Sequence, residues 1–467
     1  MVKRDGLVDK LRVTADGTGV VAHAGSALLA GTADRVGLTR ALSDAMAPTR
    51  QRASAHDPGV VLRDLVVMLS DGGDCLADLG ALRDQLDLFG GVASDSTAFR
   101  VIDSIDAACL ERLRGAVATA RARAWKLGAR PERIVLDVDA TLTTAHSPKE
   151  HAAGNFKKGY GHHPLLCYLD ACGEGVAGVL RAGNAGSNTA VDHIAVIDLA
   201  LEQLDEQALQ GEILVRADGA GATHRLTQYC REAGMRFSFG FDLDQRVRDA
   251  ITALPESAWA QAIRVDGSER KHSQVCEISD RVDLCAWPAG SRLIARRTKL
   301  KEGDQQSFAD HDGYRLAVFL ADGHASVLEL DLDHRGHARV EDRIRQAKDC
   351  GLANLPFRSF AHNQVWLWLV MLAQDLVAWT QARCLADDAR LGAQAGALPA
   401  AAPVRADRPP RPPNDAAART RLALVRPTRR RLRAPPGTAS ADRRLTPPAP
   451  PDAVSYTHLT LPTKRIV

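Results

Sequence analysis

The sequence predicts an α/β protein in which a helical region precedes a strand-and-helix core, and a β-rich segment interrupts that core. Three observations carry this prediction. Residues 10–130 are mostly helical in periodicity, short β-branched runs begin after Arg133, and strand-like runs return between Met235 and Leu332 before helix resumes. Helices and strands in this order favour layered α/β packing over an all-helical or all-β fold.

The N-terminal region, residues 1–130, has the pattern of packed helices. Val60–Leu69 has the apolar density of a buried helix, and Ser94–Thr97 supplies N-cap residues before Ala98–Ile102. A short helix, a glycine-containing turn and a capped second helix are compatible with a helix-turn-helix DNA reader, although most such pairs are merely packed together. Arg100, on the second helix, is the candidate DNA contact in this region.

The first part of the core, residues 131–234, begins with three strand-like runs whose short turns predict an antiparallel meander. An amphipathic helix, a buried strand and a further helix follow. In order, the expected elements are Ile134–Leu136, Pro164–Leu169, Gly175–Leu180, Thr189–Leu204, Glu212–Val215 and His224–Ala233. Strands, helix, strand and helix in this order are what a ribonuclease-H-like core requires.

The rest of the chain divides into three parts. Residues 235–332 form the β-rich insertion, with strand-like runs at Ser291–Arg297 and Tyr314–Leu320, and residues 333–386 return to helix at Arg339–Lys348 and Asn363–Ala382. Residues 387–467 are dominated by Ala, Arg and Pro and cannot bury enough apolar surface to order themselves. The last residues resemble translated sequencing-adapter read-through, so we expect that the reading frame was lost near residue 387.

Composition narrows the class of protein further. The chain has 467 residues and a formal net charge of only +3, and its nine cysteines include no CxxC pair, which argues against structural zinc and a disulfide framework. The N-terminus lacks the apolar core of a signal peptide, and the longest apolar stretch, Val365–Ala373, is too short to cross a bilayer. We therefore expect a cytoplasmic protein with no membrane partner.

Acidic residues at the ends of apolar runs are the candidates for chemistry. Asp137 and Asp139 lie two residues apart at the end of the first strand and so share a face, Asp218 ends the Glu212–Val215 run, and Glu341 lies within a helix. Phosphodiester chemistry with two metal ions needs several carboxylates that converge from different elements. Magnesium prefers oxygen ligands, so a few Asp and Glu residues suffice.

In these acids and the residues around them, the chain resembles the DDE transposases of bacterial insertion sequences. The resemblance is to the group with a β-rich insertion before the catalytic Glu. The resemblance covers roughly residues 10–385. It is carried by six stretches, namely Leu136–Thr141, His162–Leu166, Arg181–Thr189, Val215–Gly219, Phe239–Asp242 and His337–Arg345. Asp139, Asp218 and Glu341 match the catalytic acids of the family and would bind two Mg²⁺ ions, with Mn²⁺ as a substitute.

The resemblance leaves the first metal ligand open between Asp137 and Asp139. Asp139 is favoured, because the family's first acid commonly precedes a small residue and then Thr, as Ala140 and Thr141 do here. Lys348 matches a lysine seven residues after the Glu that would hold a DNA phosphate.

The DNA contacts depart from the family pattern. The family usually has Tyr and Arg seven and four residues before the Glu, where this chain has His334 and His337. Arg335, Arg339, Arg343 and Arg345 are near enough to substitute for the missing Arg. Trp287, in the insertion, would stack on a base displaced from the transposon end, although a packed tryptophan is an equal alternative.

The resemblance implies a nucleoid-associated transposase that binds terminal inverted repeats and joins the freed ends to target DNA, acting as a homodimer. Two alternatives remain. Asp137, Asp139 and Thr141 also spell the motif of haloacid-dehalogenase-like phosphohydrolases, in which Asp137 would be the nucleophile. The aberrant tail also allows a catalytically inactive DNA-binding remnant. Cleavage of DNA that carries the inverted repeats would separate the remnant from an active enzyme.

Overall fold

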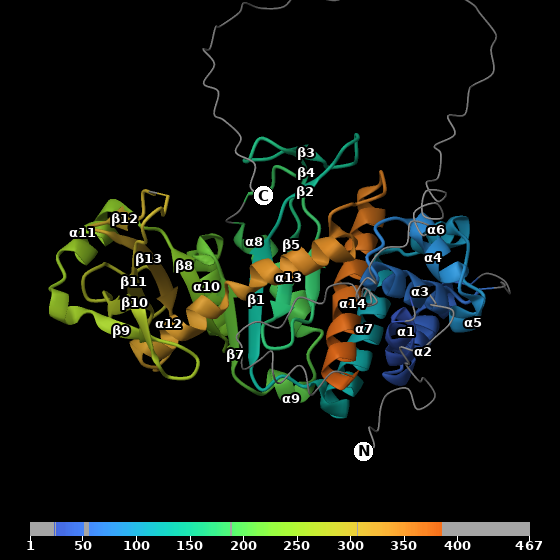
Figure 1. Cartoon of the computed structure of the whole chain (residues 1–467), viewed down its shortest axis with the longest axis horizontal. Coiled ribbons are helices and arrows are strands. Elements are labelled where there is room, and N and C mark those ends of the chain that lie inside the picture. Colours follow the sequence, from blue (N-terminus) through green and yellow to red (C-terminus); the bar gives the residue numbers. More distant parts are fainter. Residues whose placement is uncertain (1–22, 24, 51–55, 187–188, 306, 385–467) are drawn as a thin grey trace, which may run out of the picture. The chain divides into compact units, whose positions relative to one another are not determined.

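Ten strands in the described part of the chain form one mixed sheet, in the order β6-β5-β1-β7-β8-β13-β11-β10-β9, with β12 paired to β13. The computed structural model describes residues 23, 25–50, 56–186, 189–305 and 307–384, so the tail predicted at 387–467 lies outside the described residues. Helices α12 and α13 cross one face of this sheet, and the N-terminal helices gather beside α14 (Figure 1). The chain is therefore a mixed α/β protein, as predicted.

The predicted strand at Ile134 becomes β1 (Ile134–Ala140), which lies at the centre of the first five strands. All five residues from Ile134 to Val138 are buried, as expected for a strand that is covered on both faces. β1 pairs antiparallel with β5 in the predicted meander, whereas β7 runs parallel to β1 and β8 runs parallel to β7. The other strands of this half are β5 (Leu165–Leu169), β6 (Ala177–Val179), β7 (Ile213–Ala217) and β8 (Arg236–Phe241).

Two helical connections make the parallel pairings possible. α8 (Ala190–Leu201) and α9 (Glu206–Leu209) connect β6 to β7, and α10 (His224–Glu232) connects β7 to β8. Each helix buries one face, for example Leu226 and Cys230 of α10. Because parallel strands need such crossovers, the carboxyl ends of β1, β7 and β8 all lie at one edge of the sheet.

The β-rich segment continues this same sheet, since β13 pairs antiparallel with β8. Although β8 falls inside the predicted segment 235–332, it pairs with β7, so the additional strands begin only after it. They are preceded by α11 (Gln245–Thr252) and the 3₁₀ turn η5 (Glu256–Ala258). The added strands are β9 (Ala260–Ile263), β10 (Glu269–Glu277), β11 (Arg292–Lys299), β12 (Asp310–His311) and β13 (Tyr314–Ala321).

A small second sheet extends the β1–β5 pair beyond the main sheet. β2 (Thr143–Thr144) and β4 (Tyr160–His162) pair antiparallel, and β3 (Ala153–Gly154) pairs with β4. Residues 143 and 144 follow directly from β1, and β4 leads directly into β5, so the two sheets are successive parts of one long antiparallel ladder. Figure 1 shows this small sheet beyond the end of β1.

Helix returns after β13, as predicted. α12 (Val327–Gly336) contacts β8, β9 and β10, and α13 (Arg339–Ala347) contacts β1. The short turn η6 (Lys348–Leu352) then leads to the long helix α14 (Phe360–Cys384). α13 matches the predicted helix Arg339–Lys348 closely, because its buried residues recur at helical spacing at Val340, Ile344 and Ala347.

The N-terminal region is helical, as predicted, and α14 packs against it. α3 is almost wholly buried between α1, α2 and α14, which accounts for the apolar density at Val60–Leu69. The predicted cap is present, since Ser94 Oγ accepts from the Thr97 backbone N–H at 3.3 Å. The elements are α1 (Ser26–Arg35), α2 (Leu38–Met46), η1 (Ala47–Thr49), α3 (Pro58–Ser70), η2 (Leu76–Asp78), α4 (Leu79–Arg83), α5 (Leu86–Phe89), α6 (Asp95–Asp103), α7 (Ala107–Ala124) and η3 (Trp125–Ala129).

A cluster of buried ion pairs around Arg121, here called the Arg121 junction, joins α7 to the loop before β6 and to α14. The Arg121 guanidinium donates to Glu174 Oε2 at 2.7 Å, to Gln203 Oε1 at 2.8 Å and to Asp375. Trp125 Nε1 donates to the other oxygen of Glu174 at 2.9 Å. Because Arg121, Glu174 and Asp375 are all buried, each depends on the others for hydrogen bonds that water cannot supply.

Across the described ranges, no helix combines the length and the apolar character that spanning a bilayer requires.

Candidate active site

Two of the predicted acids stand side by side at the carboxyl edge of the sheet. Asp139 is near the end of β1, and Asp218 directly follows β7. The parallel register pairs Val138 with Ala217, so the next step along both strands brings Asp139 opposite Asp218. The strand ends of open α/β sheets are where such proteins place their reacting groups.

Glu341 joins these two acids from α13. It lies in the first turn of that helix, whose contact with β1 brings it to the carboxyl edge. The pKa of Asp139 is raised to about 6, first by burial and then by the negative charge of Asp218, with a smaller contribution from Glu341. His337 and the Ala140 N–H oppose this rise. The charges of Asp218 and Glu341, two acids distant from Asp139 in the sequence, therefore both act on Asp139.

The loop that carries Asp218 is held by its own hydrogen bonds and by glycine packing. Asp218 Oδ1 accepts from the Ala220 N–H at 2.9 Å and so caps the 3₁₀ turn η4 (Gly219–Gly221). Gly240 of β8 lies beneath this loop, where an added Cβ would stand 2.7 Å from the Gly219 nitrogen. Glycine at 240 is required because backbone, which cannot swing aside, occupies that space.

Asp137 proves to be a structural residue. Its two oxygens accept from Arg216 Nε at 2.8 Å and Arg216 Nη2 at 2.6 Å, and His337 Nδ1 lies 2.9 Å from Oδ1. Asp137 is only 1% exposed. The sequence left Asp137 open as a metal ligand, and this pairing corrects that expectation, because its carboxylate is already neutralised and enclosed.

Arg216 extends this buried pairing toward α12. Its Nη2 lies 2.9 Å from Asp170, and its Nη1 donates to the Asp333 carbonyl at 2.6 Å. Gly336 makes room for it, since an added Cβ would come within 2.1 Å of Arg216 Nη1. The sequence signal for this residue was an arginine inside an otherwise apolar strand, which predicts a buried ion pair.

Comparison with known proteins places the chain in a family. The family described as "Transposase DDE domain group 1" matches residues 4–399. The chain belongs to this family of DDE transposases. No curated protein matches it significantly.

A solved structure offers a weaker likeness. In the cryo-EM structure of the piggyBac transposase synaptic complex with hairpin DNA, a chain is 12% identical to this transposase, with 79% of this chain and 77% of that chain covered. The TM-score is 0.36, too low to carry an argument about the site.

His334, His337 and Arg339, which precede Glu341, each contact other residues of the transposase. The His334 ring stacks on Phe319, with centroids 4.2 Å apart, and its Nδ1 is 3.0 Å from Ser238 Oγ. His337 faces Asp137, and Arg339 donates from Nε to Asp170 at 2.6 Å. His334 is therefore occupied by Phe319 and Ser238, whereas the half-buried His337 contacts Asp137 through Nδ1, and contact of either histidine with DNA stays a prediction. Arg339, which is 47% exposed, retains a solvent-facing side.

Arg345 and Lys348 share with Glu341 the outer face of the helix. They follow Glu341 by four and seven residues, a spacing that places side chains on one side of a helix. Arg345 pairs with Asp342 at 2.8 Å in an exposed contact, and no carboxylate in the described ranges pairs with Lys348. Exposed pairs are weak, so both cations remain available to a phosphate.

The two remaining predicted DNA contacts lie in different places. The Trp287 ring packs against His224 at 4.2 Å and Phe241 at 5.4 Å between centroids, and with Arg225 it lines a shallow pocket. Phe241 ends β8 beside the Asp218 loop, so Trp287 belongs to the surroundings of the acids. Arg100 lies on the N-terminal helix α6, where it is exposed and donates to the Ser96 carbonyl at 3.1 Å.

One compact group of potential metal ligands lies in the N-terminal region. Within the described ranges, the one group of three His, Cys, Asp or Glu residues whose ligand atoms all lie within 4.8 Å of one another is Asp74, Cys75 and Asp78. Asp78 Oδ2 accepts from the backbone N–H groups of Asp74 and Cys75 and from the Cys75 thiol, so this carboxylate caps the start of η2. Asp139, Asp218 and Glu341 do not form a group this compact, and their binding of two metal ions stays a prediction.

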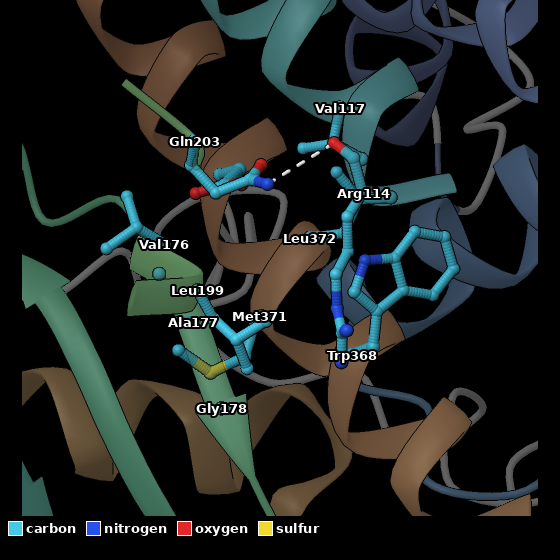
Figure 2. A pocket seen from close by; sticks show the side chains of 12 residues that line it. Arg114, Val117, Val176, Ala177, Gly178, Leu199, Gln203, Trp368, Met371 and Leu372 are labelled. Carbon is cyan, nitrogen blue, oxygen red and sulfur yellow. Dashed lines mark hydrogen bonds between the residues drawn. The ribbon is translucent and has the colours of Figure 1, made fainter. Parts of the chain in front are cut away.

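The enclosed pocket between α7, β6, α8 and α14 is not a substrate site. It is lined by Val117, Val176, Trp368, Met371 and their neighbours, and the Gln203 amide crosses it to donate to the Arg114 carbonyl at 3.3 Å (Figure 2). Its free volume is about 20 Å³, room for about one water molecule. It is a small void between packed side chains, next to the Arg121 junction.

Proposed function

We propose that this transposase binds the terminal inverted repeats of an insertion sequence, cleaves the DNA at the element ends and joins the freed ends to target DNA in a metal-dependent reaction. The observation that carries this proposal is the raised pKa of Asp139, caused by burial and by the charges of Asp218 and Glu341. Carboxylates that raise one another's pKa favour divalent cations, and Mg²⁺ takes oxygen ligands of this kind.

The strand order supports a ribonuclease-H-like core that is followed by an insertion. β6-β5-β1-β7-β8, with the first three antiparallel and the last three parallel, is the arrangement of a ribonuclease-H-like core, and the strands after β8 would be its insertion. In such a core, Asp139 and Asp218 would bind metal from adjacent strands and Glu341 from the helix. When bound, two Mg²⁺ ions, or Mn²⁺ in their place, would supply Lewis-acid activation of the attacking oxygen and stabilise the leaving oxygen.

The other residues of the site would position the reactants. Asp137 and Arg216 hold β1 to β7 and fix the spacing of Asp139 and Asp218, while His337 ties the start of α13 to the same pair. Lys348, Arg345 and Arg339 would bind phosphates, and Trp287 would meet a displaced base. Hydrolysis would free a 3′-hydroxyl, whose attack on target DNA needs no covalent protein intermediate. A homodimer that bridges both ends is part of the proposal.

The phosphohydrolase alternative is disfavoured by the surroundings of Asp137. A nucleophilic carboxylate must reach its phosphate, whereas Asp137 is buried and bonded to Arg216 through both oxygens. β1 is also followed by an antiparallel strand rather than by the parallel crossover that such enzymes use.

Cleavage of DNA tests the proposal. With a plasmid that carries the element's inverted repeats and Mg²⁺ or Mn²⁺, we expect cleavage at the repeat ends by the parent protein and at least about a thousandfold less by Glu341→Gln, since a ligand carboxylate is lost. Asp342→Asn is the matched control, because it removes the same charge one residue along the helix, and it should retain cleavage. Binding without cleavage by the parent protein would instead indicate an inactive remnant.

A further inference from the structure

We propose that the exposed tip of the small sheet, Phe156–Tyr160, is a DNA-contacting hairpin that places an aromatic ring and two lysines on DNA near the reacting phosphate. This inference rests on the proposed function for the identity of the DNA. Within the tip, Phe156 is 71% exposed and Tyr160 is 44% exposed, and Lys157, Lys158 and Gly159 between them are also exposed.

The charge of this segment matches a polyanion. Between Thr141 and Leu169 the chain has three lysines and a single acid, Glu150. Neither Lys157 nor Lys158 has a carboxylate partner in the part of the chain that the structure describes, and Lys157 Nζ lies 5.7 Å from the centre of the Phe156 ring. An aromatic ring flanked by unpaired cations is the combination with which proteins stack on bases while they hold phosphates.

The tip is preformed, so little ordering would be needed on binding. Asn155 Oδ1 accepts from the backbone N–H groups of Lys157 and Gly159, both at 3.0 Å, and the Asn155 N–H donates to the Gly159 carbonyl at 2.8 Å. Lys158 adopts a left-handed conformation, with φ of 62°. A side chain at 158 in this turn has no core to pack against, which fits a role outside the protein.

The base of the hairpin is fixed to the rest of the molecule. Phe156 packs on His163, with centroids 5.8 Å apart, and His163 is buried with Nδ1 at 3.2 Å from the Ala185 carbonyl. Glu150 Oε2 accepts from the Phe360 N–H at 2.8 Å, where α14 begins. Gly161 allows the close packing, since an added Cβ would lie 2.0 Å from the Thr143 carbonyl oxygen.

The distance to the catalytic acids follows from the ladder. Ala145, whose N–H donates to the Tyr160 carbonyl at 2.9 Å, is six residues beyond Asp139 in the sequence. At about 3.3 Å per extended residue, Ala145 is at most roughly 20 Å from Asp139. The tip lies one strand spacing and up to four residues beyond Ala145, so it is within roughly 38 Å of Asp139, or about eleven base pairs along B-form DNA. The hairpin would thus contact the element end, its flank or the target within that distance of the reacting phosphate.

The experiment compares two triple variants in the Glu341→Gln background, so that DNA is bound but not cut. Phe156→Ala/Lys157→Ala/Lys158→Ala should bind a duplex ending in the inverted repeat at least about tenfold more weakly at fixed salt, because stacking and phosphate contacts are lost together. Phe308→Ala/Lys299→Ala/Lys301→Ala is the matched control, since it removes an exposed Phe and the same charge elsewhere. The melting temperature of both variants should match that of the parent.

A photo-crosslinking residue at position 156 supplies the second readout. Crosslinks to DNA within about eleven nucleotides of the cleavage site would support the proposal, and duplexes labelled in the end, flank or target distinguish which DNA is contacted. Unchanged affinity of the hairpin variant, losses equal to those of the control, or crosslinks to a second copy of the chain would each overturn it. If the parent protein cleaves nothing, the proposed function fails, but the binding and crosslinking results still decide the hairpin.

Discussion

Asp137 and Asp139 are two residues apart on one strand, yet they have opposite surroundings. Asp137 lies between Arg216 and His337, whereas Asp139 faces Asp218 and Glu341. Counter-charge stabilises the first carboxylate, whereas burial, and after it the negative charge of Asp218, raises the pKa of the second. Asp137 is therefore a structural acid, and Asp139 is the one that we propose as the metal ligand.

These different surroundings predict that an Asp→Asn substitution changes the free energy of unfolding differently at positions 137 and 139. Asp137→Asn leaves the buried Arg216 charge under-compensated and should lower the free energy of unfolding by about 3–5 kcal/mol. Asp139→Asn relieves repulsion among the acids, so it should leave stability unchanged or raised without metal, while cleavage is lost. Denaturant unfolding in EDTA measures both. If Asp139→Asn lowered the free energy of unfolding and Asp137→Asn left it unchanged, Asp139 would be the structural acid and this assignment would be wrong.

The raised pKa of Asp139 also predicts how metal binding depends on pH. A carboxyl group with a pKa of about 6 is mostly ionised at pH 7 and mostly protonated at pH 5, and a bound cation must displace that proton. Apparent Mn²⁺ affinity should therefore fall roughly tenfold for each pH unit below about 6. Calorimetric titration between pH 5 and 8 measures this fall. An affinity that stays flat across that range would contradict the assignment of Asp139 as a ligand.

Individual elements were predictable where local chemistry determines them. The cap at Ser94, the buried helix at Val60–Leu69 and the strand at Ile134 need only near neighbours in the sequence. The Asp218 loop is different, because its position depends on Gly240, which lies on another strand. No local pattern marks that glycine as one that supports a catalytic loop.

Gly240→Ala tests this support. The added Cβ would meet the backbone of Gly219 and Asp218, so the loop must shift and carry the Asp218 carboxylate with it. Cleavage should fall at least about tenfold, the loss expected when a catalytic group is displaced by a fraction of an ångström, while DNA binding persists. Gly115→Ala, where nothing lies within 4 Å, is the control and should be stabilising by about 1 kcal/mol. Unimpaired cleavage by Gly240→Ala would show that the loop tolerates the shift.

At the scale of the molecule, the Arg121 junction joins regions that the sequence analysis treated as separate domains. It joins α7 of the N-terminal region, the loop before β6 and the C-terminal helix α14. Burial raises the pKa of Asp375 well above its usual range, although the charge of Arg121 opposes this rise. The N-terminal helices and the core are therefore expected to unfold together.

Arg121→Met tests that coupling. The substitution leaves Glu174 buried without its counter-charge, so the free energy of unfolding should fall by about 3–5 kcal/mol. Unfolding followed by tryptophan fluorescence and by circular dichroism should then remain a single coincident transition at lower denaturant. Arg383→Met, at the exposed end of α14, is the control. Two separated transitions in the parent protein would show that the regions are independent.

The sequence by itself determined the class of fold, the order of its elements and the three acids at strand and helix ends, because periodicity, caps and apolar runs are local properties of a chain. Only the tertiary structure decided which of the two neighbouring aspartates is enclosed, why His334 and His337 face inward and where the hairpin at Phe156 is exposed. Burial and counter-charge come from residues far away in the sequence, such as Arg216 beside Asp137, and no local pattern reports them.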